Sequence, residues 1–267
     1  MHKPTVKHEI KQVKRANQNP TRFRQFLLWF KPSWKMTFEE YADHYHRLNP
    51  RVRETLRRMS ADQKMEQKRF AYMIKNYGKI YGPEDNIIDH TAMVRGLRAL
   101  NIQPGAKIVS YGAGFMHHEA FLLKEFPQIG SMIGIEPLKG MREVTKKIAI
   151  NILGLRRASK MKNLNGTFEN SPIMKGSADV VISNEAFHHV KQPEDALKNL
   201  VSKLGANGGM VLIYRPDYKT NPPKPEQIAK ILAGEGMTIV TSEKTRTDPD
   251  EPNNNIHLLV AKKHGRQ

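Results

Sequence analysis

Short runs of β-favouring residues alternate with helical stretches along the chain from about residue 84 onward. This alternation is typical of an α/β domain in which crossover helices join the strands of a mostly parallel sheet. Only a turn-rich segment, 247–253, separates the last two candidate strands, which predicts a closing antiparallel pair. We expect seven strands, at residues 107–111, 131–136, 163–168, 179–184, 209–214, 237–246 and 255–263.

The helical pattern before this region breaks at Gly78 and again at Gly82-Pro83. A chain of 267 residues is long enough for one α/β domain of up to about 200–250 residues and a small extension. The sequence therefore predicts a basic, helical N-terminal region over residues 1–82 and the α/β domain over residues 83–267.

Positive charge is concentrated in the N-terminal region. Residues 1–80 hold 19 basic and 7 acidic side chains, whereas residues 81–267 hold 25 and 19. Such an excess attracts polyanions by counterion release, so we expect this region to bind a nucleic acid, RNA first of all. The alternative partner is an anionic membrane surface. Alternatively, the excess of basic residues serves only solubility and indicates no partner.

One basic segment, residues 22–35, holds both tryptophans of the chain and interleaves aromatic with basic side chains. Its aromatic rings suit stacking on unpaired bases or a position at a membrane interface. Phe23, Phe26, Leu27 and Phe30 also have helical spacing, and this favours an apolar stripe that packs on the main domain.

The chain contains no cysteine, which excludes disulfide scaffolds, thiolate zinc sites and cysteine nucleophiles. Its longest apolar runs, 26–30 and 210–214, are far shorter than the roughly 20 residues of a spanning helix or the 7–15 of a signal-peptide core. We therefore expect no transmembrane segment and a cytoplasmic location. Import into an organelle is the alternative, because residues 1–38 contain few acidic side chains.

A glycine-rich turn, Gly112-Ala113-Gly114, follows the first expected strand and precedes a helix that begins near His117. Glycines there let the backbone approach a ligand closely, and a helix N-terminus favours an anionic group. Glu136 comes 22 residues after Gly114, at the end of the second strand, where a carboxylate can accept hydrogen bonds from ribose hydroxyls. A glycine turn alone is as often structural, but the combination indicates a site for a nucleoside-bearing cofactor.

At this point the chain resembles the class I S-adenosylmethionine-dependent methyltransferases, over nearly all of residues 85–263. Five segments match in the order that the family has them: residues 100–114, 133–137, 166–172, 178–190 and 193–209. The resemblance implies a Rossmann-like fold, S-adenosyl-L-methionine as the cofactor and methyl transfer as the activity. The cofactor-binding residues that it implies are Ser110, Gly112, Gly114, Glu136, Thr167, Phe168 and Asn184.

Three positions depart from the family's usual pattern. Ser110 stands where the family usually has an acid that helps to hold the cofactor's amino group. Met116 stands where a third glycine makes room for the methionine part, and Thr167 replaces an aspartate that meets the adenine amino group. These departures support a second hypothesis, in which a methyltransferase-like fold serves RNA binding or assembly without catalysis.

Methyl transfer from a sulfonium needs mainly alignment of the reacting atoms, and it requires no metal. If the acceptor is a hydroxyl or a protonated amine, a general base assists, and the candidates are Glu185, His188 and His189. Asn184 and Phe187 have the spacing of a motif of amino-group methylases, but the two prolines of that motif are missing. RNA is the first acceptor class that we expect, with a small molecule or a protein as alternatives.

Two other site types are disfavoured. The pairs His117-His118 and His188-His189 do not predict a metal site, because adjacent helical residues face different ways and no thiolate is available. An NAD-dependent dehydrogenase needs G-x-G-x-x-G, and His117 occupies the last of those positions.

Overall fold

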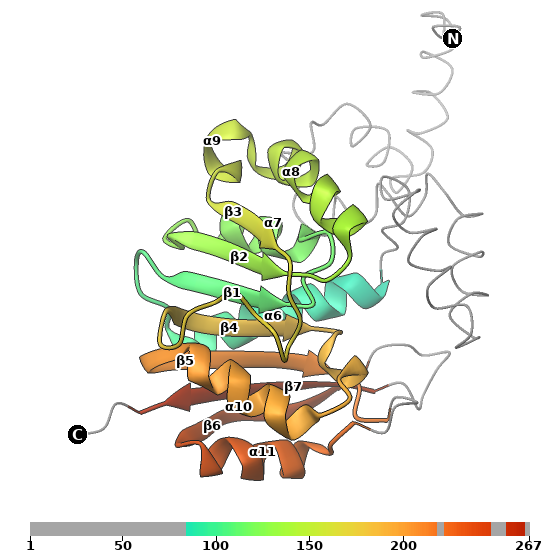
Figure 1. Ribbon diagram of the computed structural model, residues 1–267, viewed down its shortest axis with the longest axis vertical. Helices are drawn as coiled ribbons and strands as arrows, with labels where there is room; N and C mark the ends of the chain where they lie inside the picture. Colours follow the sequence, from blue (N-terminus) through green and yellow to red (C-terminus); the bar gives the residue numbers. More distant parts are fainter. Residues whose placement is uncertain (1–83, 218–221, 247–254, 265–267) are drawn as a thin grey trace, which may run out of the picture. The chain divides into compact units, whose positions relative to one another are not determined.

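The computed structural model describes residues 84–217, 222–246 and 255–264, which contain a seven-stranded sheet (Figure 1). Its strands are β1 (Lys107–Tyr111), β2 (Ser131–Ile135), β3 (Met161–Leu164), β4 (Ala178–Asn184), β5 (Leu204–Tyr214), β6 (Met237–Arg246) and β7 (Asn255–Lys263). Their order across the sheet is β3-β2-β1-β4-β5-β7-β6. The expected Rossmann-like α/β fold is confirmed.

Parallel pairing joins β3, β2, β1, β4 and β5, whereas β7 runs antiparallel between β5 and β6. In the centre of the sheet, Val109 of β1 pairs with Ile133 of β2 on one side and with Val181 of β4 on the other. Strands of a parallel sheet are covered on both faces and are therefore nearly continuous apolar runs. For this reason the apolar runs of the sequence predicted the central strands well.

Helices lie on both faces of the sheet (Figure 1), and their bounds are α6 Glu84–Leu100, α7 His117–Glu125, α8 Lys139–Leu153, α9 Leu155–Ala158, the 3₁₀ helix η4 Phe187–His189, α10 Pro193–Lys203 and α11 Pro225–Gly234. α6 contacts β5, β6 and β7, and α10 contacts β4, β5 and α11. Figure 1 shows α10 and α11 in front of the sheet and α6 and α7 behind it. Within the described ranges no helix is both long and apolar enough to cross a membrane.

The core beneath α10 is built from alternate residues of the strands. Met210, Leu212 and Tyr214 of β5 share one face of the sheet, because successive strand residues point to opposite faces. They form one buried cluster with Leu197 and Leu200, which lie on one face of α10. Each apolar side chain of this size contributes roughly 1.5–3 kcal/mol by leaving water.

β3 lies closer to the N-terminus than the predicted strand, residues 163–168. It begins at Met161 and ends at Leu164, whose carbonyl accepts the N–H of Glu136. The chain then turns, and the N–H of Thr167 donates to the carbonyl of Asn170 at 2.8 Å. The strand prediction was wrong at both ends because β2, its only neighbour among the described strands, sets where the pairing begins and stops.

β5 is longer than predicted, since it begins at Leu204, which pairs with Ala178 before an irregularity in the ladder. The other predictions for the N-terminal region, residues 1–82, lie outside the described residues, and so does the turn-rich segment 247–253. The boundary between residues 82 and 83 stays a prediction. The first helix of the described residues begins at Glu84.

Candidate functional site

The carboxyl ends of β1, β2, β4 and β5 meet at one edge of the sheet, because these four strands are parallel. The residues that follow them form the candidate site. They are the glycine turn 112–116 after β1, Glu136 after β2, residues 184–188 at and after the end of β4, and Arg215 after β5. Ligands of open α/β sheets bind outside such strand ends.

Gly112 packs the turn after β1 against the loop after β4. It has φ 67°, in the left-handed region, and its N–H donates to the carbonyl of Ile135 at 2.9 Å. A β-carbon built on Gly112 would lie 2.1 Å from Cβ of Ala186. The structure thus gives this glycine a packing role, in addition to the cofactor contact that the sequence predicts.

The Glu136 carboxylate holds the glycine turn to the end of β2. It accepts the N–H of Gly114 at 3.0 Å and the N–H of Leu138 at 2.8 Å. Glu136 is 5% exposed; burial raises its pKa, and these two hydrogen bonds and the nearby Arg142 lower it. A carboxylate has about four acceptor positions, so Glu136 keeps capacity for further donors.

Ser110 donates a hydrogen bond to the carboxylate of Glu119 on α7, with 2.6 Å between the oxygens. Both side chains are buried, and burial raises the pKa of Glu119 to about 7. The chain therefore carries an acid beside the end of β1, although the strand itself has a serine. Sequence analysis missed Glu119; the available signal was an acid in the first turn of an otherwise apolar helix face.

Met116 is accommodated by Gly134 of β2. The side chain of Met116 is fully buried, and a β-carbon on Gly134 would lie 2.6 Å from its sulfur. The same position would lie 2.8 Å from Oδ1 of Asn163, whose amide donates to the carbonyl of Gly114 at 2.9 Å. The methionine side chain therefore lies over β2, and Gly134 is a second residue that sequence analysis missed.

Thr167 and Phe168 have different environments. Thr167 is exposed, and its hydroxyl accepts the N–H of Asn170 at 3.0 Å within a tight turn. Phe168 is buried, with ring centroids 5.5 Å from Tyr111 and 6.0 Å from Phe187. Phe168 thus belongs to an aromatic cluster beneath the strand ends, and Thr167 lies above it at the surface.

Asn184 is the last residue of β4, and Glu185 follows it. The Oδ1 atom of Asn184 is buried and has no hydrogen-bond partner among the described residues. Glu185 has φ 53°, unusual for a residue with a side chain, and its carboxylate forms an ion pair with the guanidinium of Arg215. The ion pair neutralises Glu185, whereas Asn184 presents an unused acceptor atom.

His188 is buried in η4, with 3% of its surface exposed, and His189 beside it is partly exposed. Their ring centroids lie 4.4 Å apart. Within the described parts of the chain, the hydroxyls of Ser183 and Tyr214 at the ends of β4 and β5 are buried without a partner. Burial raises the pKa of Tyr214, so its hydroxyl stays protonated and able to donate.

His117 and His118 are buried at the start of α7, and burial lowers the pKa of His117 to about 3. Both imidazoles are therefore neutral at physiological pH, since the pKa of His118 is lowered as well. Among the described residues, no three His, Asp or Glu side chains are placed to hold a metal ion together.

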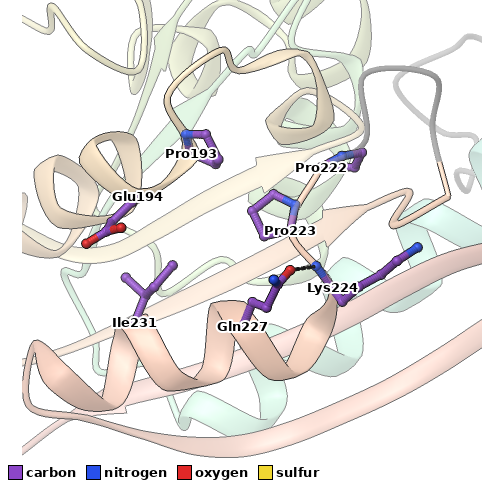
Figure 2. A pocket seen from close by; sticks show the side chains of 7 residues that line it. All are labelled: Pro193, Glu194, Pro222, Pro223, Lys224, Gln227 and Ile231. Atoms are coloured by element: carbon purple, nitrogen blue, oxygen red, sulfur yellow. Dashed lines mark hydrogen bonds between the residues drawn. The ribbon is translucent and has the colours of Figure 1, made fainter.

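A separate groove lies between α10 and α11 and has a volume of about 490 Å³ (Figure 2). Within it, the N–H of Lys224 donates to the side chain of Gln227 at 2.8 Å. No residue of the glycine turn and no strand-end acid lines this groove, so it is distinct from the candidate site. The residues that line it are Pro193, Glu194, Pro222, Pro223, Lys224, Gln227 and Ile231.

Residues 109–213 match the family described as methyltransferase domain. An uncharacterized methyltransferase of Oceanobacillus iheyensis is 30% identical over 125 residues, which are 46% of this chain and 52% of that protein. The chain thus spans about half the length of this curated relative.

Solved structures share the fold. A methyltransferase of Haloferax volcanii, in complex with the Trm112 methyltransferase activator, has a TM-score of 0.53 at 15% identity, over 67% of this chain and 94% of that one. A SAM-dependent methyltransferase of Aquifex aeolicus has a TM-score of 0.51 at 15% identity, over 63% of this chain and 88% of that one. The strand order, the match of residues 109–213 to the methyltransferase domain and the solved structures agree, and the described part of the chain has the fold of these methyltransferases.

Proposed function

We propose that this chain transfers a methyl group from S-adenosyl-L-methionine to an acceptor, and that the acceptor is RNA. The observation that carries the proposal is the Glu136 carboxylate, which accepts the N–H of Gly114 at 3.0 Å. One buried acid thereby joins the glycine turn to the strand end where a ribose is expected, and it keeps acceptor positions for the ribose hydroxyls.

A second observation also supports a cofactor at this edge of the sheet. The Oδ1 atom of Asn184 is buried and has no hydrogen-bond partner among the described residues, so it can accept a hydrogen bond from a bound molecule. When bound, the cofactor supplies an activated methyl group on a sulfonium. The backbone of the glycine turn and Glu136 would hold its nucleoside part, while Thr167 and Phe168 would border the adenine. We assign Ser110 to the same site through its hydrogen bond to Glu119.

The catalytic contribution of the chain is mainly alignment. Asn184 can accept a hydrogen bond from an N–H or O–H of the acceptor, and so orient it. Glu185 is held by Arg215, and His188 is 3% exposed, so either side chain takes a proton only if the acceptor displaces its present neighbours. His188, Glu185 and Asn184 are therefore the residues that a test of catalysis has to vary.

The acceptor class follows from charge. Residues 1–80 carry 19 basic and 7 acidic side chains, and a polyanion gains free energy by releasing counterions on such a surface. We propose that this N-terminal basic region recruits RNA to the methyltransferase domain, in the cytoplasm.

The direct test has two stages and uses the full chain. Calorimetric titration with S-adenosyl-L-methionine and with its demethylated product measures cofactor binding. Incubation with tritiated cofactor and total RNA, a protein extract or a metabolite extract then identifies the acceptor. We expect the chain to bind the cofactor and to transfer tritium to RNA, so that ribonuclease treatment releases the label. Label in metabolites identifies a small-molecule methyltransferase, and failure to bind the cofactor removes the assignment of the site.

A second candidate function is RNA binding or assembly without methyl transfer. The pairing of Glu185 with Arg215 and the burial of His188 favour it, because neither side chain is poised as a base. Cofactor binding without label in any acceptor pool would support this function over the first.

A further inference from the structure

Basic side chains are concentrated in one stretch of the methyltransferase domain, between the start of α8 and the end of β3. Residues 139–162 hold eight Lys and Arg residues and one acid, Glu143. The rest of residues 81–267 holds 17 basic and 18 acidic residues, so its balance is slightly negative. We name the exposed cations of this stretch the α8–β3 basic surface; they are Lys139, Lys146, Lys147, Arg156, Arg157 and Lys162.

The fold brings these cations to one end of the sheet. α8 buries Met141, Ile148 and Ile152 against the domain, which leaves Lys146 and Lys147 on its outer side. α8 contacts both α9 and β3, and β3 is an outermost strand of the sheet. Figure 1 shows α8, α9 and β3 together at that end.

Most of these charges are not neutralised within the described residues. Lys139 lies 3.7 Å from the carboxylate of Glu143, and both side chains are largely exposed. The other five cations of the surface form no ion pair in the described part of the domain. The two less exposed cations of the stretch have structural partners instead, because Arg142 donates to the carbonyl of Glu136 and Lys160 to that of Ile129.

Two simpler explanations account for less of this pattern. A lysine on an outermost strand protects it against pairing with another chain, but this explains Lys162 alone. A membrane surface would need apolar anchors beside the cations. The apolar face of α8 is buried in the domain, and Leu155 is the one large exposed apolar side chain of this stretch. Six exposed cations with a single exposed apolar side chain among them favour phosphates over a membrane.

We propose that the α8–β3 basic surface binds the phosphate backbone of single-stranded RNA. A flexible single strand can follow a surface that passes from a helix to a short helix and then to a strand, whereas a stiff duplex follows a straight path. The surface begins at Lys139, three residues after Glu136, and continues along α8 to α9, which precedes the amino end of β3. That this surface holds the RNA as a methyl acceptor rests on the proposed function. That it binds RNA at all does not depend on the proposed function.

The test compares two charge-matched variants of the full chain. The surface variant is Lys146→Gln, Lys147→Gln, Arg156→Gln and Arg157→Gln. The control variant is Arg98→Gln, Lys175→Gln, Lys191→Gln and Lys230→Gln, which removes four exposed cations elsewhere in the domain. Fluorescence anisotropy with a labelled single-stranded RNA of mixed sequence, at several salt concentrations, gives the affinity and its salt dependence.

The surface variant should bind this RNA about tenfold or more weakly, and the slope of log affinity against log salt should become shallower by about 2–3, at about 0.7 per lost phosphate contact. The control variant should keep a slope close to that of the parent. Equal losses in both variants, or an unchanged slope in the surface variant, would overturn the proposal. The proposal would also be overturned if the parent bound phosphatidylserine vesicles but not RNA, and the surface variant lost this vesicle binding.

Cofactor titration of the same two variants separates this proposal from the proposed function. Both variants should bind S-adenosyl-L-methionine as the parent does, because none of the changed residues belongs to the candidate cofactor site. If the parent binds RNA through this surface but does not bind the cofactor, the proposed function fails and the RNA surface stands.

Discussion

The hydroxyl of Ser110, near the end of β1, donates a hydrogen bond to the carboxylate of Glu119 on α7. Both side chains are buried, and the two oxygens lie 2.6 Å apart. Burial raises the pKa of Glu119 from 4.5 to about 7. The acid beside the glycine turn thus comes from the helix that follows it, and its charge depends on pH near neutrality.

The first prediction concerns the stability of the fold as a function of pH. Because the pKa of Glu119 is higher in the folded than in the unfolded protein, the folded state binds more protons between these two values. This residue should therefore lower the free energy of unfolding progressively as the pH rises from about 4.5 to about 7, by about 3 kcal/mol in all. Glu119→Gln removes the ionisation and should be more stable than the parent at about pH 8, with little difference near pH 4.5.

Urea unfolding at several pH values checks this, and Glu143→Gln, which changes an exposed acid, is the control. The comparison is between variant and parent, because the lowered pKa values of His117 and His118 act in the opposite direction over a pH range that overlaps this one. Parallel pH profiles for Glu119→Gln and the parent would contradict the burial of a carboxylate here.

The second prediction concerns the contact between the turn after β1 and the loop after β4. Gly112→Ala should destabilise the fold by about 1–3 kcal/mol more than Gly176→Ala. Both glycines have a positive φ, 67° and 69°, but a β-carbon at Gly112 meets Ala186 at 2.1 Å and one at Gly176 meets nothing within 4 Å. Chemical denaturation of the two variants measures the difference.

A double variant tests the assigned cause. Ala186→Gly removes the opposing β-carbon, so it should recover much of the stability that Gly112→Ala loses. Simple addition of the two effects would show that the contact does not explain the loss.

The third prediction concerns the cofactor. Glu136→Gln should weaken binding of S-adenosyl-L-methionine at least about tenfold, because hydrogen bonds to a charged acceptor contribute roughly 1.5–3 kcal/mol each. The amide also places a donor near the N–H groups of Gly114 and Leu138, so some loss of stability is expected too. Calorimetry gives the affinity, and the exposed Glu169→Gln serves as the control. A folded Glu136→Gln with the affinity of the parent would remove the ribose assignment.

The fourth prediction concerns the ion pair between Glu185 and Arg215, whose side chains are 20% and 18% exposed. Glu185→Gln and Arg215→Gln should each destabilise the fold, and the double variant should lose less than the sum. A coupling of about 1–3 kcal/mol is expected for a pair between the surface and the buried limits. A double-mutant cycle by urea unfolding measures it.

The same variants also test the role of Glu185 in methyl transfer. A general base would make Glu185→Gln inactive while Arg215→Gln keeps activity. If Glu185 only positions other groups, Glu185→Gln and Arg215→Gln should lose similar amounts of activity, and the dependence of the rate on pH should not change. These outcomes separate the catalytic assignment of Glu185 from a structural one.

The sequence by itself determined the central strands and the antiparallel end of the sheet, and it indicated Glu136 as the candidate acid of the site. Strands buried on both faces are continuous apolar runs, so the central strands were visible from local composition, and the turn 247–253 indicated the antiparallel end. Glu136 was identifiable because a strand end and a glycine turn at a fixed spacing come to the same edge of any such sheet. These features depend on neighbours along the chain.

Only the tertiary structure decided which side chains meet at that edge. The contact of Glu119 with Ser110 and that of Gly134 with Met116 depend on the path of the turn after β1 and on how far each side chain is buried. Glu185 pairs with Arg215, which lies 30 residues away and directly after β5, and no local pattern encodes such a pairing. Which face a residue meets, and how far it is buried, depends on elements distant in the sequence, and for that reason composition and spacing could not predict these contacts.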